Sequence, residues 1–292
     1  MNFLLKKNLI TKLLIKIVLF YIILVLIMFV FQRSFMYFPF GKITKVPKEF
    51  QEIFLSSPDN KELYTWYKAP LSNQKTILYF HGNAGNMAGR KDRLIELSKN
   101  FGILAISYRG YSRSEGSPSQ EGFFIDAETA LDFLFAKTIY PQDIILFGES
   151  IGSGVATNMT KQRDFYALIL EAPFSSILSI AKKNYWFLPV SLILKDRFES
   201  IKDANKISTP LLIFHAKGDK IVPYQEGQKL YEQFNTYKKF ISFDGDFHIA
   251  LTGEYLREQI QIFANEVEMD NKIKLQKLIK LRELRQKNML LK

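Results

Sequence analysis

A chain of 292 residues, 47% of them hydrophobic, is long enough for one large folded domain or two small ones. Because the chain contains no cysteine, disulfides, thiolate metal sites and a cysteine nucleophile are excluded. Its formal net charge of +11 comes from its two ends, with +5 in residues 1–33 and +7 in residues 271–292, which leaves −1 for residues 34–270 and excludes the basic folded body that binds nucleic acid.

The first predicted element is an apolar segment near the amino terminus. Residues 17–31 are apolar without interruption, and residues 13–15 extend the run beyond Lys16. About nineteen residues at 1.5 Å per residue approach the roughly 30 Å of a bilayer core. The segment is longer than the apolar region of a cleaved signal peptide, no small-residue cleavage site follows it, and it has no polar face. We therefore predict that residues 1–33 form one transmembrane helix with a basic flank, retained as a membrane anchor.

The charges that flank this segment are nearly balanced, with four lysines before it and Arg33, Lys42, Lys45 and Lys48 after it. The positive-inside rule therefore gives only a small preference between the two orientations. We expect a single-pass N-terminal signal anchor that leaves the folded body outside the cytoplasm. The aromatic residues within 35–40 are typical of a belt at the membrane–water interface.

From about residue 50, short apolar runs alternate with longer amphipathic ones. Strands separated by helices indicate an α/β domain, over residues 34–270, with a mostly parallel central sheet and helices on both faces. The first two strands lie close together in sequence, which is typical of an antiparallel edge. The predicted strands are 51–56, 62–68, 76–80, 103–107, 143–147, 167–171, 210–215 and 239–243, and the predicted helices are 87–99, 120–136, 151–161, 224–235 and 254–267.

The last predicted segment is a basic C-terminal tail, residues 271–292, with isoleucine and leucine scattered through it. Its apolar residues do not gather on one helical face. We therefore expect a solvated helix or a frayed tail, and an amphipathic helix on a membrane surface is the alternative.

A motif for nucleophilic chemistry follows the strand predicted at 143–147. Gly148, Ser150 and Gly152 form the pattern G-x-S-x-G, which is typical of a nucleophile elbow between a strand and a helix. The glycines keep Cβ atoms out of a crowded turn, and the strained backbone exposes the Ser150 hydroxyl. Because this pattern also occurs by chance, it predicts a hydrolase only if the chain supplies a base, an acid and an oxyanion hole.

The base must be one of three histidines, since a serine hydroxyl is a poor nucleophile until its proton is removed. His81 directly follows one predicted strand and begins a glycine-rich loop. His215 ends another strand, where we expect it to pack or to hydrogen-bond at the strand end. His248 lies just past the last predicted strand, where the chain order Ser…Asp…His places the base. We therefore predict His248.

The predicted acid is Asp219, which follows the strand that ends at His215. It would accept a hydrogen bond from Nδ1 of His248 and stabilise the imidazolium. Asp244 and Asp246 are nearer to His248 in sequence, but we interpret them as turn residues that make local hydrogen bonds. Their Asp-Gly-Asp stretch lacks the further acidic ligands of a Ca²⁺ loop. We predict no metal and no cofactor.

The oxyanion hole needs two backbone N–H donors. Ile151, directly after the serine at the start of its helix, supplies one. Asn83 in the loop 81–86 is the predicted second donor. The rival interpretation of this loop as a phosphate cradle fails because the Gly-Lys-Ser/Thr ending of a P-loop is absent.

Four motifs together resemble those of the α/β-hydrolase superfamily, with a domain like that of the serine aminopeptidases. They are HGNAGN at 81–86, YRGYSRSEG at 108–116, GESIGSG at 148–154, and HAKGD followed by FH within 215–248. More narrowly, the stretch QRSFMYFP at 32–39 after an apolar span is similar to that of the membrane-anchored, bud-emergence-type group. The resemblance implies the α/β-hydrolase fold. It also implies Ser150 as nucleophile, His248 as base and Asp219 as acid.

The resemblance departs from its pattern at two positions, both in loops. Ser112 stands where a glycine is usual, and so does Ala216. Members of the group include esterases, lipid hydrolases and thioesterases that act on acylated proteins. The resemblance therefore implies a membrane-anchored serine hydrolase that cleaves acyl esters or thioesters through an acyl-enzyme, with a lipid or an acylated protein as substrate. A serine aminopeptidase-type peptidase and a non-catalytic binding protein on the same fold are the alternatives.

The segment 174–209 is long enough for a small lid. Tyr185, Trp186, Phe187 and Leu188 give it an apolar surface that suits an acyl chain, and simple packing against the sheet is the other interpretation.

Overall fold

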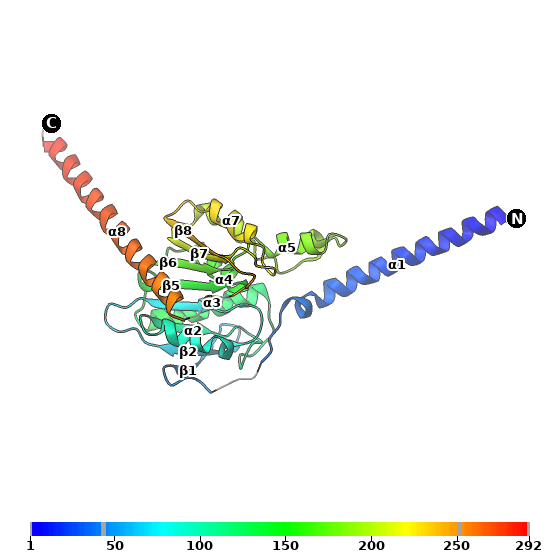
Figure 1. Ribbon diagram of the computed structural model, residues 1–292, viewed down its shortest axis with the longest axis horizontal. Helices are drawn as coiled ribbons and strands as arrows, with labels where there is room; N and C mark the ends of the chain where they lie inside the picture. The colour runs from blue at the N-terminus through cyan, green and yellow to red at the C-terminus, as the bar shows by residue number, and fades with distance from the viewer. Residues whose placement is uncertain (1, 42–44, 250, 252, 291–292) are drawn as a thin grey trace.

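The computed structural model describes residues 2–41, 45–249, 251 and 253–290. Over these residues a central sheet carries helices on both faces, and a long helix leaves the body at each end of the chain (Figure 1). The strand order is β1-β2-β4-β3-β5-β6-β7-β8. β1 pairs with β2 and β2 with β4 in antiparallel fashion, and all later neighbours are parallel. The predicted mostly parallel sheet with an antiparallel edge is confirmed.

The elements follow the predicted order, and every strand predicted in the described residues begins and ends within two residues of its expected position. The strands are β1 Gln51–Ser56, β2 Glu62–Lys68, β3 Thr76–Phe80, β4 Gly102–Ile106, β5 Ile144–Glu149, β6 Ala167–Glu171, β7 Leu211–Ala216 and β8 Lys238–Phe243. The helices are α1 Asn2–Met36, η1 Met87–Arg90, α2 Lys91–Leu97, α3 Gln120–Ala136, η2 Pro141–Asp143, α4 Ile151–Met159, α5 Ile177–Asn184, α6 Val190–Ile193, η3 Ser200–Lys202, η4 Ala204–Lys206, α7 Tyr224–Gln233 and α8 Gly253–Leu290.

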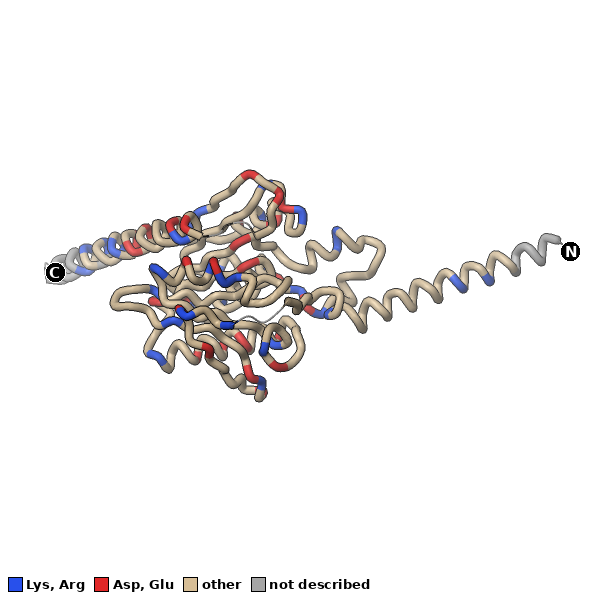
Figure 2. The backbone as a smooth tube through the Cα atoms, turned by 60° about the horizontal axis from the view of Figure 1, so that its bottom comes forward, with Lys and Arg blue, Asp and Glu red and all other residues tan. Residues whose placement is uncertain are grey.

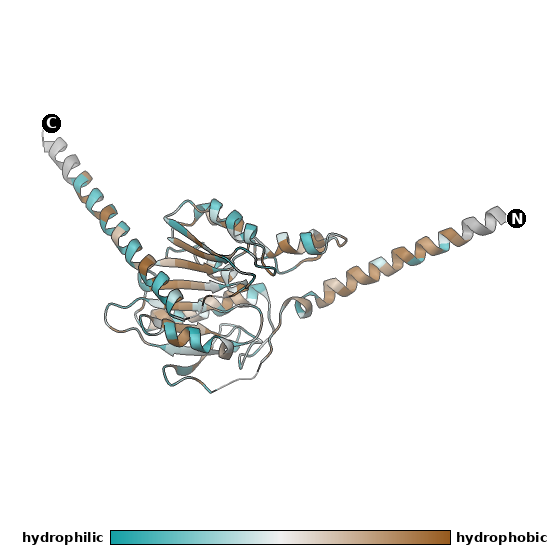
Figure 3. Cartoon of the chain, in the orientation of Figure 1, coloured by the Kyte–Doolittle hydropathy of each residue, from teal (hydrophilic) through white to brown (hydrophobic). Residues whose placement is uncertain are grey.

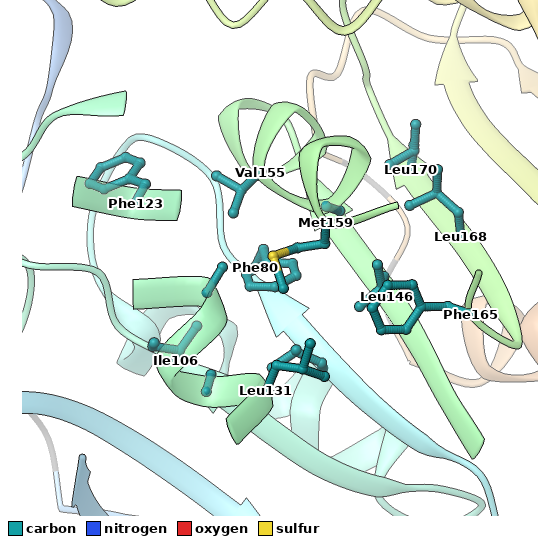
Figure 4. Packing of buried hydrophobic residues seen from close by; sticks show 14 of the residues in the cluster. Phe80, Ile106, Phe123, Leu131, Leu146, Val155, Met159, Phe165, Leu168 and Leu170 are labelled. Carbon is teal, nitrogen blue, oxygen red and sulfur yellow. The ribbon is translucent and has the colours of Figure 1, made fainter. Parts of the chain in front are cut away.

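Apolar side chains fill both faces of the sheet, because the central strands are buried on both sides. On one face, residues of β3, β5 and β6 pack against α3, α4 and α7. Figure 4 shows part of this cluster, in which Phe80, Leu146 and Leu168 lie near Val155 and Met159 of α4. On the other face, the strands pack against α2 and the first part of α8. Each fully buried Leu, Ile or Phe contributes about 1.5–3 kcal/mol relative to an exposed side chain.

The parallel strands bring the predicted site residues to one edge of the sheet. Phe80 of β3 pairs with Gly148 of β5, and Ala216 of β7 pairs with Phe243 of β8. The carboxyl ends of these four strands therefore lie at the same edge, which is where ligands bind in open α/β sheets.

The helix α1 extends away from the body and is brown, that is hydrophobic, along most of its length (Figure 3). Residues Leu9–Met36 are long and apolar enough to cross a membrane, and no part of their most apolar window is buried in the protein. The prediction of an aromatic belt over 35–40 is wrong for Tyr37, whose ring is buried in the core and whose hydroxyl donates to Asp196 at 3.0 Å.

The predicted end of the last helix is also wrong, because α8 continues from Gly253 to Leu290 without a break at 267. It leaves the body on the side away from α1 (Figure 1), and its charged residues are mostly acidic near the body and mostly basic further out (Figure 2). The i,i+4 pairs Lys272–Glu268 and Lys274–Asp270 stabilise it, as expected for a solvated helix. The division at 33/34 and 270/271 stays a prediction.

Candidate active site

The turn at Ser150 is too tight for side chains at the flanking glycines. Ser150 has φ +52° and ψ −115°, a conformation that L-residues rarely adopt. A Cβ atom at Gly148 would lie 2.5 Å from the carbonyl oxygen of Gly152, and one at Gly152 would clash with the carbonyl of Phe80. The Ser150 N–H is held by the Glu171 carbonyl at 2.9 Å. The sequence motif therefore forms the sharp strand-to-helix turn that its glycines predict.

Three of the predicted residues meet at this turn. The Nε2 atom of His248 lies 2.7 Å from the Ser150 Oγ, and its Nδ1 atom lies 2.7 Å from the Asp219 Oδ2. The other oxygen of Asp219, Oδ1, accepts hydrogen bonds from the backbone N–H groups of Ile221 and Val222 at 2.8 and 3.0 Å. These two backbone bonds fix the Asp219 carboxylate through Oδ1, and its other oxygen, Oδ2, faces the imidazole of His248.

Asp219 is held in its charged form. Burial alone would raise its pKa, but hydrogen bonds with His215 and His248 outweigh burial and lower the pKa below its usual range. His215 is fully buried, and its Nε2 lies 3.0 Å from the Val222 carbonyl oxygen and 3.5 Å from Asp219 Oδ2. The expectation that His215 hydrogen-bonds at its strand end is confirmed.

The nearer aspartates point elsewhere. Asp244 pairs with Lys217 and Asp246 with Lys220, each at 2.9 Å, and both carboxylates are exposed. Such surface ion pairs contribute little to the free energy of unfolding. Asp219, and neither of these two, is the carboxylate that contacts His248.

His81 has a structural environment. It is buried, and its ring centroid lies 4.5 Å from that of Tyr108 and 5.1 Å from that of Tyr111. Its Nδ1 lies 2.7 Å from the Gly82 carbonyl oxygen. Burial, with a smaller effect of the Arg90 charge, lowers its pKa to about 4. The ring is therefore neutral near pH 7.

The loop after β3 approaches the serine closely. A Cβ atom added at Gly82 would lie 3.6 Å from that of Ser150, and Asn83 and Ile151 line the same cavity as Ser150. The N–H of Ile151 is the first of α4, so no intrahelical acceptor exists for it. Over the described part of the chain, neither this N–H nor that of Asn83 donates to a protein acceptor. Both backbone donors of the predicted oxyanion hole are thus beside the serine.

A buried cluster of charged residues, which we did not predict, holds the loop after β3 in place. Glu149 accepts from the Tyr79 hydroxyl at 2.6 Å, and from Gly82 N and Arg90 Nε at 3.3 Å. Burial opposes its charge, but Arg90 and Arg93 lower its pKa to about 2. Its signal in the sequence is an acidic residue at the end of an otherwise apolar strand.

The neighbouring strand repeats this signal. Glu171 ends β6 and pairs in register with Glu149. It forms a buried double hydrogen bond with Arg93, which also binds the Leu251 carbonyl. Burial, the largest effect, raises the pKa of Glu171 despite this arginine. The two carboxylates are therefore compensated by arginines from the segment 90–93.

The end of α1 is also tied to the body. Asp196 accepts from Arg33 Nε at 2.9 Å, from Arg33 Nη2 at 3.0 Å and from the Tyr37 hydroxyl at 3.0 Å. The side chain of Asn83 links this end to the site, because its Nδ2 donates to the Met36 carbonyl at 2.6 Å. These partners are about 160 residues apart for Asp196 and 47 for Asn83, so no local pattern in the sequence indicates them.

The cavity at Ser150 has a volume of about 440 Å³ and mostly apolar walls. No group of His, Asp and Glu side chains in the described ranges is placed to hold a metal ion. The cavity is lined by Met36, Phe38, Gly82, Asn83, Ala84, Arg90, Ser150, Ile151, Phe174, Ile177, Ile180, Ile221, Val222, His248 and Ile249.

The chain is similar to known hydrolases. Residues 193–254 match the family described as serine aminopeptidase, S33. The chain is 32% identical over 249 residues to the uncharacterized protein YfhR of Escherichia coli O157:H7, covering 79% of this chain and 86% of that protein. It is 37% identical over 191 residues to the lysophosphatidylserine lipase ABHD12 of Danio rerio, covering 57% of this chain and only about half, 49%, of that relative.

Solved structures show the same fold. The Pyrococcus furiosus esterase Pf2001 matches with a TM-score of 0.63 at 20% identity, over 79% of this chain and 97% of that one. An esterase of Rhodococcus sp. ECU1013 matches with a TM-score of 0.57 at 13% identity, over 75% of this chain and 99% of that one. The narrower bud-emergence-type resemblance stays a prediction.

Proposed function

The chain belongs to the α/β-hydrolase superfamily, and we propose that it is a membrane-anchored serine hydrolase that cleaves acyl ester or thioester bonds. The observation that carries this proposal is the continuous hydrogen-bonded path from Ser150 through His248 to Asp219, at the wall of an apolar cavity. This is the geometry in which a base activates a serine and an acid orients the base.

The proposed reaction has two halves. His248 Nε2 takes the proton of Ser150 as the hydroxyl attacks the acyl carbonyl, and the charged Asp219 stabilises the resulting imidazolium. The backbone N–H groups of Asn83 and Ile151 stabilise the oxyanion of the tetrahedral intermediate. His248 then returns the proton to the leaving alcohol or thiol. In the second half, water activated by His248 attacks the acyl-enzyme, and the acid is released.

An acyl substrate fits the chemistry of the cavity. Phe174, Ile177 and Ile180 form one wall, and apolar walls with few polar groups favour a hydrocarbon chain. The lipase named among the relatives acts on a lipid ester, which supports the same class here. As part of the proposal, α1 anchors the hydrolase in the membrane, with the folded body outside the cytoplasm.

The second candidate is an aminopeptidase, which the family match over residues 193–254 favours. An aminopeptidase must bind the charged α-amine of its substrate, and a carboxylate near the serine is the usual partner for an ammonium group. Among the described lining residues there is no Asp or Glu, and Arg90 adds a positive charge. This lining favours an acyl ester over a peptide with a free amine.

Covalent labelling by a fluorophosphonate probe tests the proposed nucleophile. Ser150→Ala should abolish labelling and lower the rate of ester hydrolysis at least about 10⁴-fold, because the residues of a triad act as a unit. Ser153→Ala is the matched control, since Ser153 lies one turn further along α4 and its hydroxyl has no hydrogen-bond partner in the described structure. A folded wild type that neither labels nor hydrolyses any of a panel of esters would instead support a binding protein.

A further inference from the structure

An apolar groove of about 300 Å³ lies between the end of α1 and the segment that contains α5 and α6. Met28 and Phe35 of α1 form one side of it. Ala181 and Asn184 of α5 form another, and Leu194 follows α6. Over the described residues that line it, the groove has no charged side chain. Such a surface is costly to expose to water and favours an apolar occupant.

The groove continues into the cavity at Ser150. Met36, Ile177, Ile180 and Ile221 line both spaces. Ile177 and Ile180 lie on the face of α5 that also carries Ala181 and Asn184, as expected for residues three and four apart on a helix. An extended apolar chain can therefore run from the serine to α1 along a continuous apolar wall.

The far end of the groove lies beside the apolar part of α1. The Tyr21 hydroxyl donates to the Phe187 carbonyl at 2.9 Å, so the loop between α5 and α6 reaches back along the helix. Tyr21 is 15 residues before Met36, which is about 22 Å at 1.5 Å per residue. Trp186 on this loop and Leu192 of α6 are 82% and 83% exposed. A membrane that surrounds α1 over Leu9–Met36 would surround these side chains too.

The contact between α1 and the α5–α6 segment is fixed by polar bonds. Asp196, whose side chain is 4% exposed, binds Arg33 and Tyr37. Gln32 accepts from the Lys195 N–H at 2.7 Å and donates to the Ile193 carbonyl at 3.0 Å. These bonds fix α1 to the segment 193–196, and a preorganised groove lowers the entropy cost of binding a chain there.

We propose that this groove binds the acyl chain of the substrate, and that the substrate is a membrane-resident lipid ester. Its chain enters from the lipid between α1 and α5, and its carbonyl reaches Ser150. This inference rests on the proposed function and names its substrate class. A lipid is favoured over an acylated protein because the groove opens beside the apolar helix, where a lipid diffuses directly into it.

The test uses the full-length protein in lipid nanodiscs and two fluorophosphonate probes, one with an ethyl chain and one with a hexadecyl chain. Ala181→Trp and Asn184→Trp each place a large ring in the groove, at positions that do not line the cavity at Ser150. Lys183→Trp is the matched control, because Lys183 lies on the same helix, is exposed and does not line the groove. Each methylene of the probe that is buried in the groove strengthens binding about fourfold. A tryptophan that keeps two or more methylenes of the hexadecyl chain out of the groove should therefore slow labelling at least about tenfold.

The ethyl probe reports folding and the nucleophile separately from the groove. We expect its labelling rate to change by less than about twofold in all three variants, as for substitutions away from the reacting groups. Asn184 is exposed, so its variant tolerates the ring if Ala181→Trp fails to fold. Unchanged hexadecyl labelling in Asn184→Trp would overturn the groove assignment and leave the proposed function standing. A wild type that reacts with neither probe would overturn both.

A substrate competition in the same nanodiscs decides the chemical class. We expect a single-chain glycerophospholipid ester to be hydrolysed faster than a peptide that carries a hexadecanoyl thioester on cysteine. The opposite order would overturn the lipid assignment and identify the occupant as the chain of an acylated protein.

Discussion

The site at Ser150 and the groove beside α1 are neighbours that keep their shapes by different means. At Ser150 the shape comes from backbone sterics at two glycines and from buried ion pairs of Glu149 and Glu171. The groove is shaped by apolar side chains and by polar bonds of α1 to the segment 193–196. We therefore expect substitutions near Ser150 to change the rate of the reaction itself, and substitutions in the groove to change which acyl chain is accepted.

Among substitutions of a single carboxylate, we expect the change at Asp219 to lower the rate of ester hydrolysis most. Asp219→Asn should lower kcat for ester hydrolysis by about 10⁴-fold, because an amide holds the wrong tautomer of His248. Asp244→Asn is the matched control, since this carboxylate pairs with Lys217 on the surface. Equal losses in the two variants, measured with a short-chain ester, would show that the acid had been misassigned. We expect no groove variant to approach this loss with the same ester.

Acid should destabilise the folded protein through the buried imidazole of His81. His81 is buried with its pKa lowered from 6.5 to about 4, so between these pH values the unfolded chain binds a proton that the folded chain does not. The free energy of unfolding must therefore fall as the pH drops through this window, by about 3 kcal/mol in total. The groove has no Asp, Glu or His among its described lining residues to add a similar slope.

Glu149 loses its contribution at lower pH, because its folded pKa of about 2 is below its ordinary 4.5. Between pH 7 and pH 5 Glu149 therefore changes little, whereas the raised pKa of Glu171 gives a contribution of the opposite sign, so the contribution of His81 is the part of the slope that a His81 variant removes. Denaturant unfolding in detergent at these two pH values measures the slope, and His81→Gln should flatten it. A slope that persists in His81→Gln would assign the acid sensitivity to another group.

The same difference between the two regions explains what the sequence could predict. The strand before Ser150 and the elbow itself are encoded by consecutive residues, an apolar run followed by glycines at fixed spacing, so local reasoning located them. Asp219 and His248 followed from the chain order, because parallel strands end at one edge. Ser112, noted as a departure from the glycine pattern, does adopt the positive φ of +50° that a glycine would allow.

Tyr185 and Leu188 of the predicted lid segment 174–209 do line the groove, but the groove as a whole, with α1 as its other side, could not be predicted in this way. Its helices are short, eight residues for α5 and four for α6, and too short to show a period. The bonds at Asp196 join residues about 160 apart, which is why the aromatic stretch around Tyr37 was assigned to a membrane interface. A solvated helix was one of the two expectations for 271–292, but its continuity with the helix predicted at 254–267 was missed, since ion pairs such as Lys272–Glu268 stabilise α8 without an apolar face.

The smallest effect concerns the loop between α5 and α6, and the tryptophan content of the chain makes it measurable. The chain has two tryptophans: Trp66 is buried in the core at 1% exposure and Trp186 is 82% exposed on the α5–α6 loop. In nanodiscs made with lipids brominated in their chains, the wild-type emission should fall, and Trp186→Phe should remove this fall because only Trp66 remains. Quenching of equal size in both proteins, or none in the wild type, would place the loop outside the lipid. The groove would then open to water, and its substrate would have to leave the membrane before it reached Ser150.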